Sequence, residues 1–325
     1  MDFAGWIPMR IWWRDSRPLV DWVYLGARRL TEPFFGQTLD RCLRQPADLL
    51  FRPQTPLEQL GEIAATQPAL RPTGFIFHMS RCGSTLISQM LAASPENIVI
   101  SEAAPIDQLL RAHFRDAGIT ENQRMQWLQW LVQILSWRRH PLEKNVFIKF
   151  DCWHALFLPL IQRAFPAVPW IFVYREPLEV MVSHHHHRGG QMVPGVLEPA
   201  LFGWDAETIG RVALNEYGAR VLGKICEAAL AQVQNGNGKL VNYQQLPGAI
   251  WPELMKFWRV EYSGDERERM FCAAKWHAKN PVLPFEADGQ AKRNSAPAEL
   301  RALTQPWLAG VYQQLEAQRA AVGFV

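Results

Sequence analysis

Short apolar runs separated by longer amphipathic stretches organise residues 75–243. Each run is rich in β-branched or aromatic residues and is bounded by turn residues, which predicts a buried strand. The predicted strands are 75–77, 97–102, 145–150, 169–174 and 239–243. Apolar residues at helical spacing predict helices between them, chiefly at 121–138, 153–165 and 206–233. Because strands alternate with helices, we predict an α/β fold of three layers (αβα) around a central, mostly parallel sheet.

Both ends of the chain depart from this pattern. In residues 1–70, Trp, Phe and Arg are interrupted by prolines, which predicts a mainly helical extension with a helix at 56–66 capped by Thr55. We expect 71–325 to form the main domain, with mixed helices at 251–280 and a last helix near 306–320. Two interpretations of the extension stay open, a structural lid or dimer contact and a wall of an acceptor pocket.

A polar turn of small residues at 80–85 joins the first predicted strand to a helix. Strand, small-residue turn and helix form the layout of a phosphate-binding loop, because backbone N–H groups and the positive helix end converge on an anion. Gly83 allows the backbone to approach a ligand closely. Ser84 and Thr85 add hydroxyl groups in the first helical turn.

The same turn differs from a Walker A loop, Gly-x-x-x-x-Gly-Lys-Ser/Thr. His78 stands at the position of the first Gly, and Ser84 stands where the Lys would be. Arg81 supplies a cation from inside the loop instead. The turn therefore predicts an anion site without the usual Lys–Mg²⁺ pair.

Charged residues follow the other predicted strands. Glu102 ends the second strand, and ligands of parallel α/β sheets bind at the carboxyl ends of strands. Lys149 lies in an apolar strand, where a cation is unfavourable unless it meets an anion; an ion-paired structural lysine is the alternative.

Arg175 follows the 169–174 strand, and Ser183 lies eight residues later on the helix that Pro177 opens. A guanidinium and a hydroxyl so linked suit a phosphate group.

The loop Ser-Arg-Cys-Gly-Ser-Thr-Leu (80–86) and the spacing Arg175-x7-Ser183 together resemble the sulfotransferase family, closest in motif layout to bacterial and tyrosylprotein-type enzymes. The resemblance implies 3′-phosphoadenosine 5′-phosphosulfate (PAPS) as co-substrate and 3′-phosphoadenosine 5′-phosphate (PAP) as product. It implies a transferase that moves a sulfuryl group to a hydroxyl or amine acceptor, with no metal ion.

The resemblance also implies roles for individual residues. The 5′-phosphosulfate is expected to bind six consecutive residues, Ser80, Arg81, Cys82, Gly83, Ser84 and Thr85, with Arg81 also catalytic. Glu102 would act as the general base, and Lys149 would stabilise charge on the oxygen that bridges phosphate and sulfur. Arg175 and Ser183 would bind the 3′-phosphate.

Two later segments extend the resemblance. The strand at 239–243 ends in Tyr243, as a late strand of the family does, but Gln244 and Gln245 replace the family's acidic pair. Lys292 and Arg293 are expected to belong to a late basic loop that closes over the nucleotide; solvated surface charge is the alternative.

Several alternatives remain open from the sequence. His154 and His78 compete with Glu102 as the base. A P-loop kinase or NTPase that uses Mg-ATP is a second function, in which Asp151 would mimic the acidic residue after a Walker B strand. A third is an inactive nucleotide-binding protein on the same fold. The run 184–187, four histidines, favours an exposed helix end over a metal site, because adjacent helical residues point in different directions.

Composition narrows these functions only slightly. A net charge of +3 is too small to indicate a nucleic-acid partner. Five Cys without CxxC spacing argue against a zinc site or a disulfide scaffold. No apolar run is long enough to span a membrane and no leader pattern begins the chain, so we expect a cytoplasmic protein without a membrane anchor. The acceptor is expected to be a small molecule or peptide, and a homodimer is left open.

Overall fold

A parallel sheet of five strands forms the centre of the computed structural model, which describes residues 2–44, 50–234, 237–284 and 288–322. The strands are β4 (Gly74–His78), β5 (Asn97–Ser101), β6 (Asn145–Lys149), β7 (Trp170–Tyr174) and β8 (Gly238–Asn242). Their order across the sheet is β5-β6-β4-β7-β8, and every neighbouring pair is parallel. The predicted α/β class with a parallel central sheet is confirmed.

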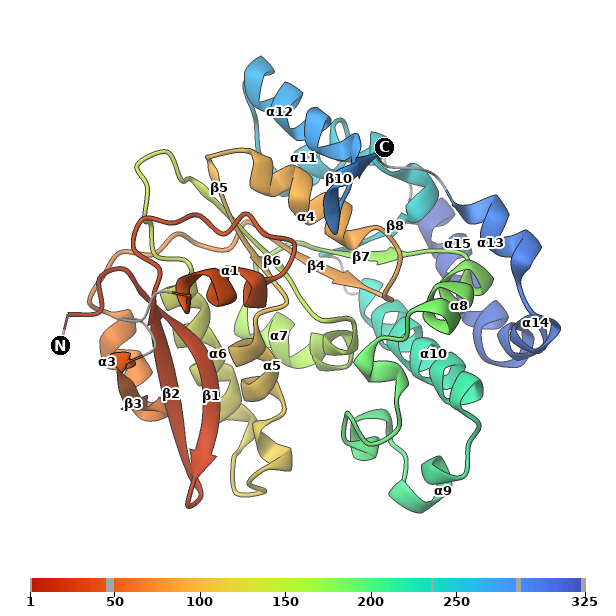
Figure 1. Ribbon diagram of the computed structural model, residues 1–325, viewed down its shortest axis with the longest axis horizontal. Helices are drawn as coiled ribbons and strands as arrows, with labels where there is room; N and C mark the ends of the chain where they lie inside the picture. Colours follow the sequence, from red (N-terminus) through yellow and green to blue (C-terminus); the bar gives the residue numbers. More distant parts are fainter. Residues whose placement is uncertain (1, 45–49, 235–236, 285–287, 323–325) are drawn as a thin grey trace.

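Helices cover both faces of this sheet (Figure 1). Their bounds are α4 (Ser84–Ala93), α5 (Ala104–Leu110), α6 (Glu121–Leu135), α7 (Leu158–Ala164), α8 (Pro177–His186) and α10 (Leu214–Val233). Helix α4 lies on one face, and α6, α7 and α10 lie on the other. Every residue of β4, β5 and β7 is buried between these layers, which explains why the strands are apolar without alternation. Among the described helices, none is long and apolar enough to cross a membrane.

The N-terminal extension is not mainly helical, so this prediction was wrong. Strands β1 (Trp6–Arg14), β2 (Arg17–Tyr24) and β3 (Gln54–Pro56) form an antiparallel sheet, beside the short helices α1 (Phe35–Cys42) and α3 (Leu60–Ala64). Prolines and charged residues concealed the strand alternation. Thr55 does not cap a helix; its hydroxyl accepts a hydrogen bond from Trp22 Nε1 at 3.0 Å. The division at residue 70 stays a prediction, since one hydrophobic core joins both segments.

The C-terminal third also differs from expectation. The stretch predicted as one helix at 206–233 is broken into α9 (Ala206–Gly210) and α10. The 251–280 region contains α11 (Leu254–Trp258) and α12 (Gly264–Ala274), and then an unpredicted hairpin of β9 (Trp276–His277) and β10 (Asn280–Pro284). Helices α13 (Gly289–Ser295), α14 (Ala298–Thr304) and α15 (Gly310–Val322) complete the described chain, with a π-helical turn at Gln305–Ala309.

Candidate active site

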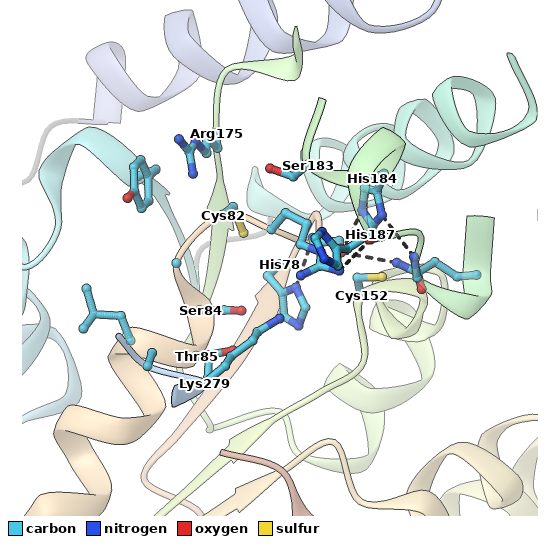
Figure 2. A pocket seen from close by; sticks show the side chains of 18 of the residues that line it. His78, Cys82, Ser84, Thr85, Cys152, Arg175, Ser183, His184, His187 and Lys279 are labelled. Atoms are coloured by element: carbon cyan, nitrogen blue, oxygen red, sulfur yellow. Dashed lines mark hydrogen bonds between the residues drawn. The ribbon is translucent and has the colours of Figure 1, made fainter. Parts of the chain in front are cut away.

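A cavity of about 580 Å³ lies at the carboxyl ends of the parallel strands (Figure 2). The residues that directly follow the strands line it: the 80–85 loop after β4, Glu102 after β5, Asp151 after β6, Arg175 after β7 and Tyr243 after β8. The strand order therefore places the predicted loop at the centre, with the other predicted residues on both sides.

The 80–85 loop has an unusual backbone. Ser80, Arg81 and Gly83 have φ angles of 82°, 51° and 88°, a region that favours glycine. A Cβ atom on Gly83 would lie 2.8 Å from the Tyr243 ring and 2.9 Å from Leu246, so a side chain does not fit there. Helix α4 begins at Ser84, and the N–H groups of Ser84 and Thr85 at its start have no carbonyl of an earlier helical turn to bind. This geometry suits an anion.

Ser80 is held by two side chains from the segment after β7. His184 Nε2 lies 3.1 Å from Ser80 Oγ, and Gln191 Nε2 donates to the same oxygen at 3.2 Å. The Gly189 N–H donates to His184 Nδ1 at 3.3 Å, so in the neutral ring Nε2 carries the proton and also donates. Since the Ser80 oxygen receives both bonds, its own proton is left to donate to a ligand.

His184 corrects the expectation of an exposed histidine run. It is buried, with an exposed fraction of 2%, whereas His185, His186 and His187 are exposed. Burial and the nearby Arg81 and Arg188 lower the pKa of His184 to about 3, so the ring is neutral at physiological pH. It acts as part of the loop's support.

Two further residues fix the loop. Arg81 donates a hydrogen bond to the backbone oxygen of His187 at 2.6 Å, which bends its side chain along the cavity wall. The Cys82 thiol donates to the Val173 carbonyl at 3.0 Å, and burial raises its pKa to about 12. Cys82 is therefore a neutral packing residue here, and the loop presents its backbone at that position.

Glu102 and Lys149 form an ion pair at the edge of the loop. Lys149 is fully buried, and Glu102 has a φ of 54° while its N–H donates to the Lys149 carbonyl at 2.7 Å. Burial favours the neutral acid, but the Lys149 ammonium and His78 outweigh it and hold the pKa of Glu102 well below its usual range. Glu102 is thus an ionised carboxylate that lines the cavity.

The His78 ring lies beside that carboxylate, although its Nε2 forms no hydrogen bond there. The Ser80 N–H donates to His78 Nδ1 at 3.0 Å, so neutral His78 carries its proton on Nε2. Nε2 lies 3.4 Å from Glu102 Oε1. Burial lowers the pKa of His78, which keeps the ring neutral. A protonated Nε2 cannot accept an acceptor's proton, so the geometry favours Glu102 over His78 as the base.

His154 lies outside the cavity lining. The Asp151 N–H donates to its Nδ1 at 3.2 Å, and its Nε2 lies 3.0 Å from Asp107 Oδ1. Asp107, Asp151 and His154 could supply ligand atoms within 4.8 Å of one another. However, Trp153 donates to Asp107 at 2.7 Å and Arg111 at 2.6 Å, so its oxygens are already satisfied. These contacts describe a buried polar network, and they disfavour His154 as the base.

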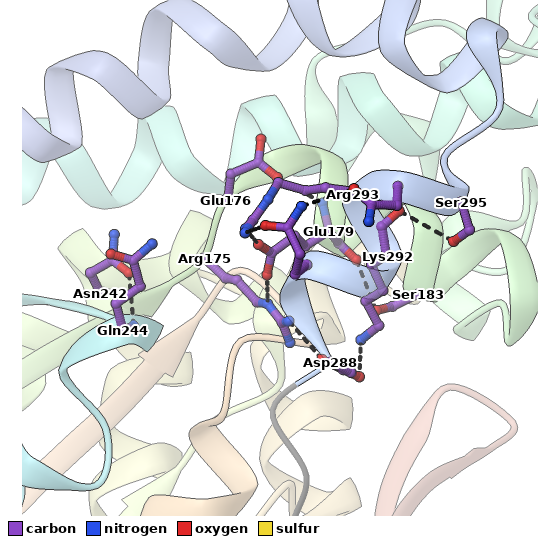
Figure 3. A network of polar contacts seen from close by, with 12 residues as sticks. Arg175, Glu176, Glu179, Ser183, Asn242, Gln244, Asp288, Lys292, Arg293 and Ser295 are labelled. Carbon is purple, nitrogen blue, oxygen red and sulfur yellow. Dashed lines mark hydrogen bonds and ion pairs between the residues drawn. The ribbon is translucent and has the colours of Figure 1, made fainter.

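Arg175 lies at the centre of a second polar cluster (Figure 3). Its Nε donates to Glu179 at 2.6 Å, and a terminal nitrogen donates to Asp288 at 2.7 Å. Its guanidinium carbon lies 4.0 Å from the centroid of the Tyr243 ring, which forms a cation–π contact. The bonds with both carboxylates outweigh burial and raise the pKa of Arg175.

The remaining predicted cations join this cluster. Lys292 pairs with Asp288 at 2.6 Å, and Arg293 pairs with the buried Glu179. The Ser183 hydroxyl donates to the Glu179 carbonyl at 2.9 Å and lines the cavity. Lys292 and Arg293 lie on helix α13, not in a loop, and both form ion pairs within the protein, so their part in binding a nucleotide stays a prediction.

Comparison with known proteins identifies the family. The sequence model of the family described as "Sulfotransferase family" matches residues 72–246, more than half of the chain. The chain belongs to the sulfotransferase family. This confirms the family predicted from the loop and the Arg175–Ser183 spacing.

Solved structures similar to the chain include other sulfotransferases. STF9 from Mycobacterium avium is 13% identical over 77% of this chain and 79% of that chain, with a TM-score of 0.47. STF1 from Mycobacterium tuberculosis H37Rv is 13% identical over 84% and 83%, with a TM-score of 0.45. Retinol dehydratase, solved with retinol and PAP, is 15% identical over 79% and 85%, with a TM-score of 0.39. No curated protein sequence matches the chain.

Sequence reasoning missed several residues of this sulfotransferase-family site. Phe34, Lys279 and Asp288 line the cavity from outside the 72–246 stretch. Two other missed residues, Gln191 and the buried His184, lie inside the 72–246 stretch, in a segment that we expected to be exposed. A single Lys or Asp in a polar loop carries no periodic signal, so only the three-dimensional arrangement reveals these residues.

Proposed function

We propose that this sulfotransferase-family chain uses PAPS, transferring its sulfuryl group to a hydroxyl or amine acceptor and releasing PAP. One observation carries the proposal: a single cavity is lined by the 80–85 loop, by Glu102, which pairs with the buried Lys149, and by the Arg175 cluster. PAPS has two anionic ends, a 5′-phosphosulfate and a 3′-phosphate. The two basic regions of the cavity match these ends.

The loop would bind the 5′-phosphosulfate. Its backbone, the first turn of α4 and the Arg81 guanidinium would supply donors and positive charge. The Ser80 proton and the Ser84 and Thr85 hydroxyls supply further donors. Gly83 fits this role because its missing Cβ leaves room between the loop and Tyr243.

The Arg175 cluster would bind the 3′-phosphate and so distinguish PAPS from ATP. Arg175 and Ser183 face the cavity, with Lys292 beside them. A phosphate that binds the terminal nitrogen now bonded to Asp288 would displace that carboxylate, which holds Arg175 at 2.7 Å. Glu179 keeps the guanidinium in place during this exchange, because it binds Nε and leaves a terminal nitrogen to the ligand.

Glu102 would accept the proton of the acceptor. The oxygen of the acceptor forms a bond to sulfur while the bond between sulfur and the 5′-phosphate oxygen breaks, and the electron pair leaves with PAP. Lys149 would move toward that leaving oxygen and stabilise its charge. As Lys149 moves away, the pKa of Glu102 rises, so the carboxylate becomes a stronger base when the donor is in place.

Positioning and charge stabilisation dominate transfers of this kind. A sulfuryl group carries fewer negative charges than a phosphoryl group, so N–H groups, one guanidinium and one ammonium can balance it. Ser84 at the position of the Walker Lys supports this function over a Mg-ATP kinase. The acceptor would be a small molecule or a peptide that enters beside Phe34 and Trp153, which line the cavity.

Thermal denaturation with nucleotides tests the proposal. PAP should raise the melting temperature clearly more than ADP at equal concentration, because ADP has no 3′-phosphate to bind Arg175. An equal shift, or a larger shift with Mg-ATP that a chelator removes, would contradict the proposed co-substrate and favour the kinase alternative. Transfer of the labelled sulfuryl group from PAPS to a panel of acceptors then tests turnover.

A further inference from the structure

The hairpin of β9 and β10 brings a cation to the reacting end of the cavity. His277 pairs with Asn280, so Ala278 and Lys279 form the tip of the hairpin, and both line the cavity. Figure 2 shows Lys279 among the side chains that line the cavity, together with Ser84 and Thr85 of the loop. Lys279 lies outside the stretch that matches the family, and none of the motifs identified in the sequence includes it.

Lys279 and Lys149 share one aromatic ring. Their ammonium groups lie 5.4 Å and 5.2 Å from the centroid of Phe34. An aromatic face attracts cations, so the Phe34 ring stabilises both ammonium groups. Lys149 is buried at the end of β6 and reaches the cavity through its partner Glu102, whereas Lys279 lines the cavity from the tip of the hairpin.

Positive charge exceeds negative charge in the part of the cavity around Lys279. The groups that act on Lys279 are Arg81 and Cys82 from the loop, Glu102 after β5, and Lys149 from β6. Lys279 in turn acts on His78 and His184, which are both neutral. Partial burial, Arg81 and Lys149 together lower the pKa of Lys279 to about 8. Glu102 already pairs with Lys149, and no described carboxylate forms an ion pair with Lys279. Asp151 is the second carboxylate of this region, and burial raises its pKa to about 7, so it is only partly ionised. Arg81, Lys149 and Lys279 therefore outnumber the ionised carboxylates, and the excess positive charge defines a place for an anionic group.

We propose that Lys279 is a further catalytic cation, which contacts the terminal oxygens of the sulfuryl group while that group passes from the 5′-phosphate to the acceptor. The inference rests on the proposed function. Arg81 and the loop bind the 5′-phosphate, and Lys149 neutralises the leaving oxygen. Lys279 binds the sulfuryl oxygens from the tip of the β9–β10 hairpin. No proton leaves Lys279 in this step; the acceptor proton goes to Glu102.

Binding of PAPS and PAP by the full-length protein tests the proposal, because only PAPS carries the sulfuryl group. We expect Lys279→Met to weaken PAPS binding about tenfold or more, as for a lost charge-assisted hydrogen bond, while PAP affinity changes less than about threefold. Lys279→Arg should restore most of the PAPS affinity. Lys275→Met is the matched control: Lys275 is also exposed and also lies over a ring, 5.5 Å from Phe271, but does not line the cavity.

The pH dependence supplies a second readout that a structural role would not change. Above about pH 8 the unbound Lys279 loses its proton, so PAPS affinity of the wild type should fall as the pH rises through that value. This fall in PAPS affinity should be absent in Lys279→Met and should move to higher pH in Lys279→Arg. Native PAPS affinity and an unchanged pH dependence in Lys279→Met would overturn the proposal.

Other outcomes are also decisive. Equal losses of PAPS and PAP affinity in Lys279→Met would overturn a sulfuryl contact and make Lys279 a phosphate ligand. If wild-type protein binds PAP no better than ADP, the proposed co-substrate itself fails and this inference fails with it. If wild type prefers PAP and Lys279→Met binds PAPS normally, only the role of Lys279 fails.

Discussion

An oxygen of Asp288 lies 2.7 Å from a terminal nitrogen of Arg175, the guanidinium proposed to bind the 3′-phosphate. The carboxylate thus occupies an anion's position inside the basic cluster. Lys292 holds it from the other side at 2.6 Å. If PAP binds at Arg175 as proposed, Asp288 would compete with it as an internal ligand, and this competition would weaken binding and assist the departure of PAP after transfer.

Asp288→Asn should therefore tighten PAP binding by about three- to tenfold, since the amide keeps the shape but loses the charge that competes for Arg175. Isothermal titration measures the change, and PAP should dissociate more slowly. Asp265→Asn, at an exposed carboxylate in the first turn of α12, is the control. Weaker PAP binding in Asp288→Asn would mean that Asp288 organises the basic cluster instead.

Glu102→Gln should leave PAP binding intact and slow sulfuryl transfer by about 10²- to 10⁴-fold, because the amide cannot accept the acceptor's proton. PAP affinity should not fall, since Lys149 remains and loses its internal partner. Labelled PAPS measures the rate. Glu96→Gln is a matched control, because Glu96 precedes the same strand and pairs with Lys144 far from the cavity. Native turnover in Glu102→Gln would remove Glu102 as the base.

Gly83→Ala should abolish measurable PAP binding and lower the free energy of unfolding by about 1–3 kcal/mol, through strain at a φ of 88° and contact with Tyr243. Gly248→Ala is the control, since no heavy atom lies within 4 Å of its added Cβ. Chemical denaturation and PAP titration measure the two effects separately. A Gly83→Ala protein that binds PAP normally would show that the loop does not need the close approach.

His184 predicts a pH dependence of stability. Its pKa is about 3 in the folded protein, below its ordinary value, so between that pKa and about pH 6.5 the unfolded chain binds more protons and stability rises with pH. His184→Gln should remove this contribution, up to about 1.4 kcal/mol per pH unit. The difference between wild type and variant is measured by denaturation from pH 5 to 7. A constant difference over this range would contradict a buried, neutral His184.

The sequence was most informative where chemistry follows a buried strand. Apolar runs predicted all five strands of the parallel sheet, and the order of loop, Glu102, Lys149 and Arg175 along the chain placed them at one edge. The rule works because residues beyond the ends of parallel strands share one crevice. The same reasoning left the base undecided, and only the hydrogen bonds of His78 and His154 separate them from Glu102.

The parts missed from the sequence arise from long-range contacts. His184 looked exposed because it begins a run of four histidines, yet its bond to Ser80 depends on how α8 packs against the loop. The β1–β2 pairing was missed because Pro8, Pro18 and several arginines break the alternation on which strand prediction depends. Lys279 depends on a hairpin that follows α12 and has no motif of its own.

Phe34 gives the N-terminal extension a part in the proposed reaction chamber, since its ring lies against both Lys149 and Lys279. The stretch that matches the family begins only at residue 72. Exchanging that stretch between family members would therefore transplant the loop and Arg175 without this aromatic wall. Such hybrids should bind nucleotide yet leave the sulfuryl group open to bulk water, so that hydrolysis competes with transfer.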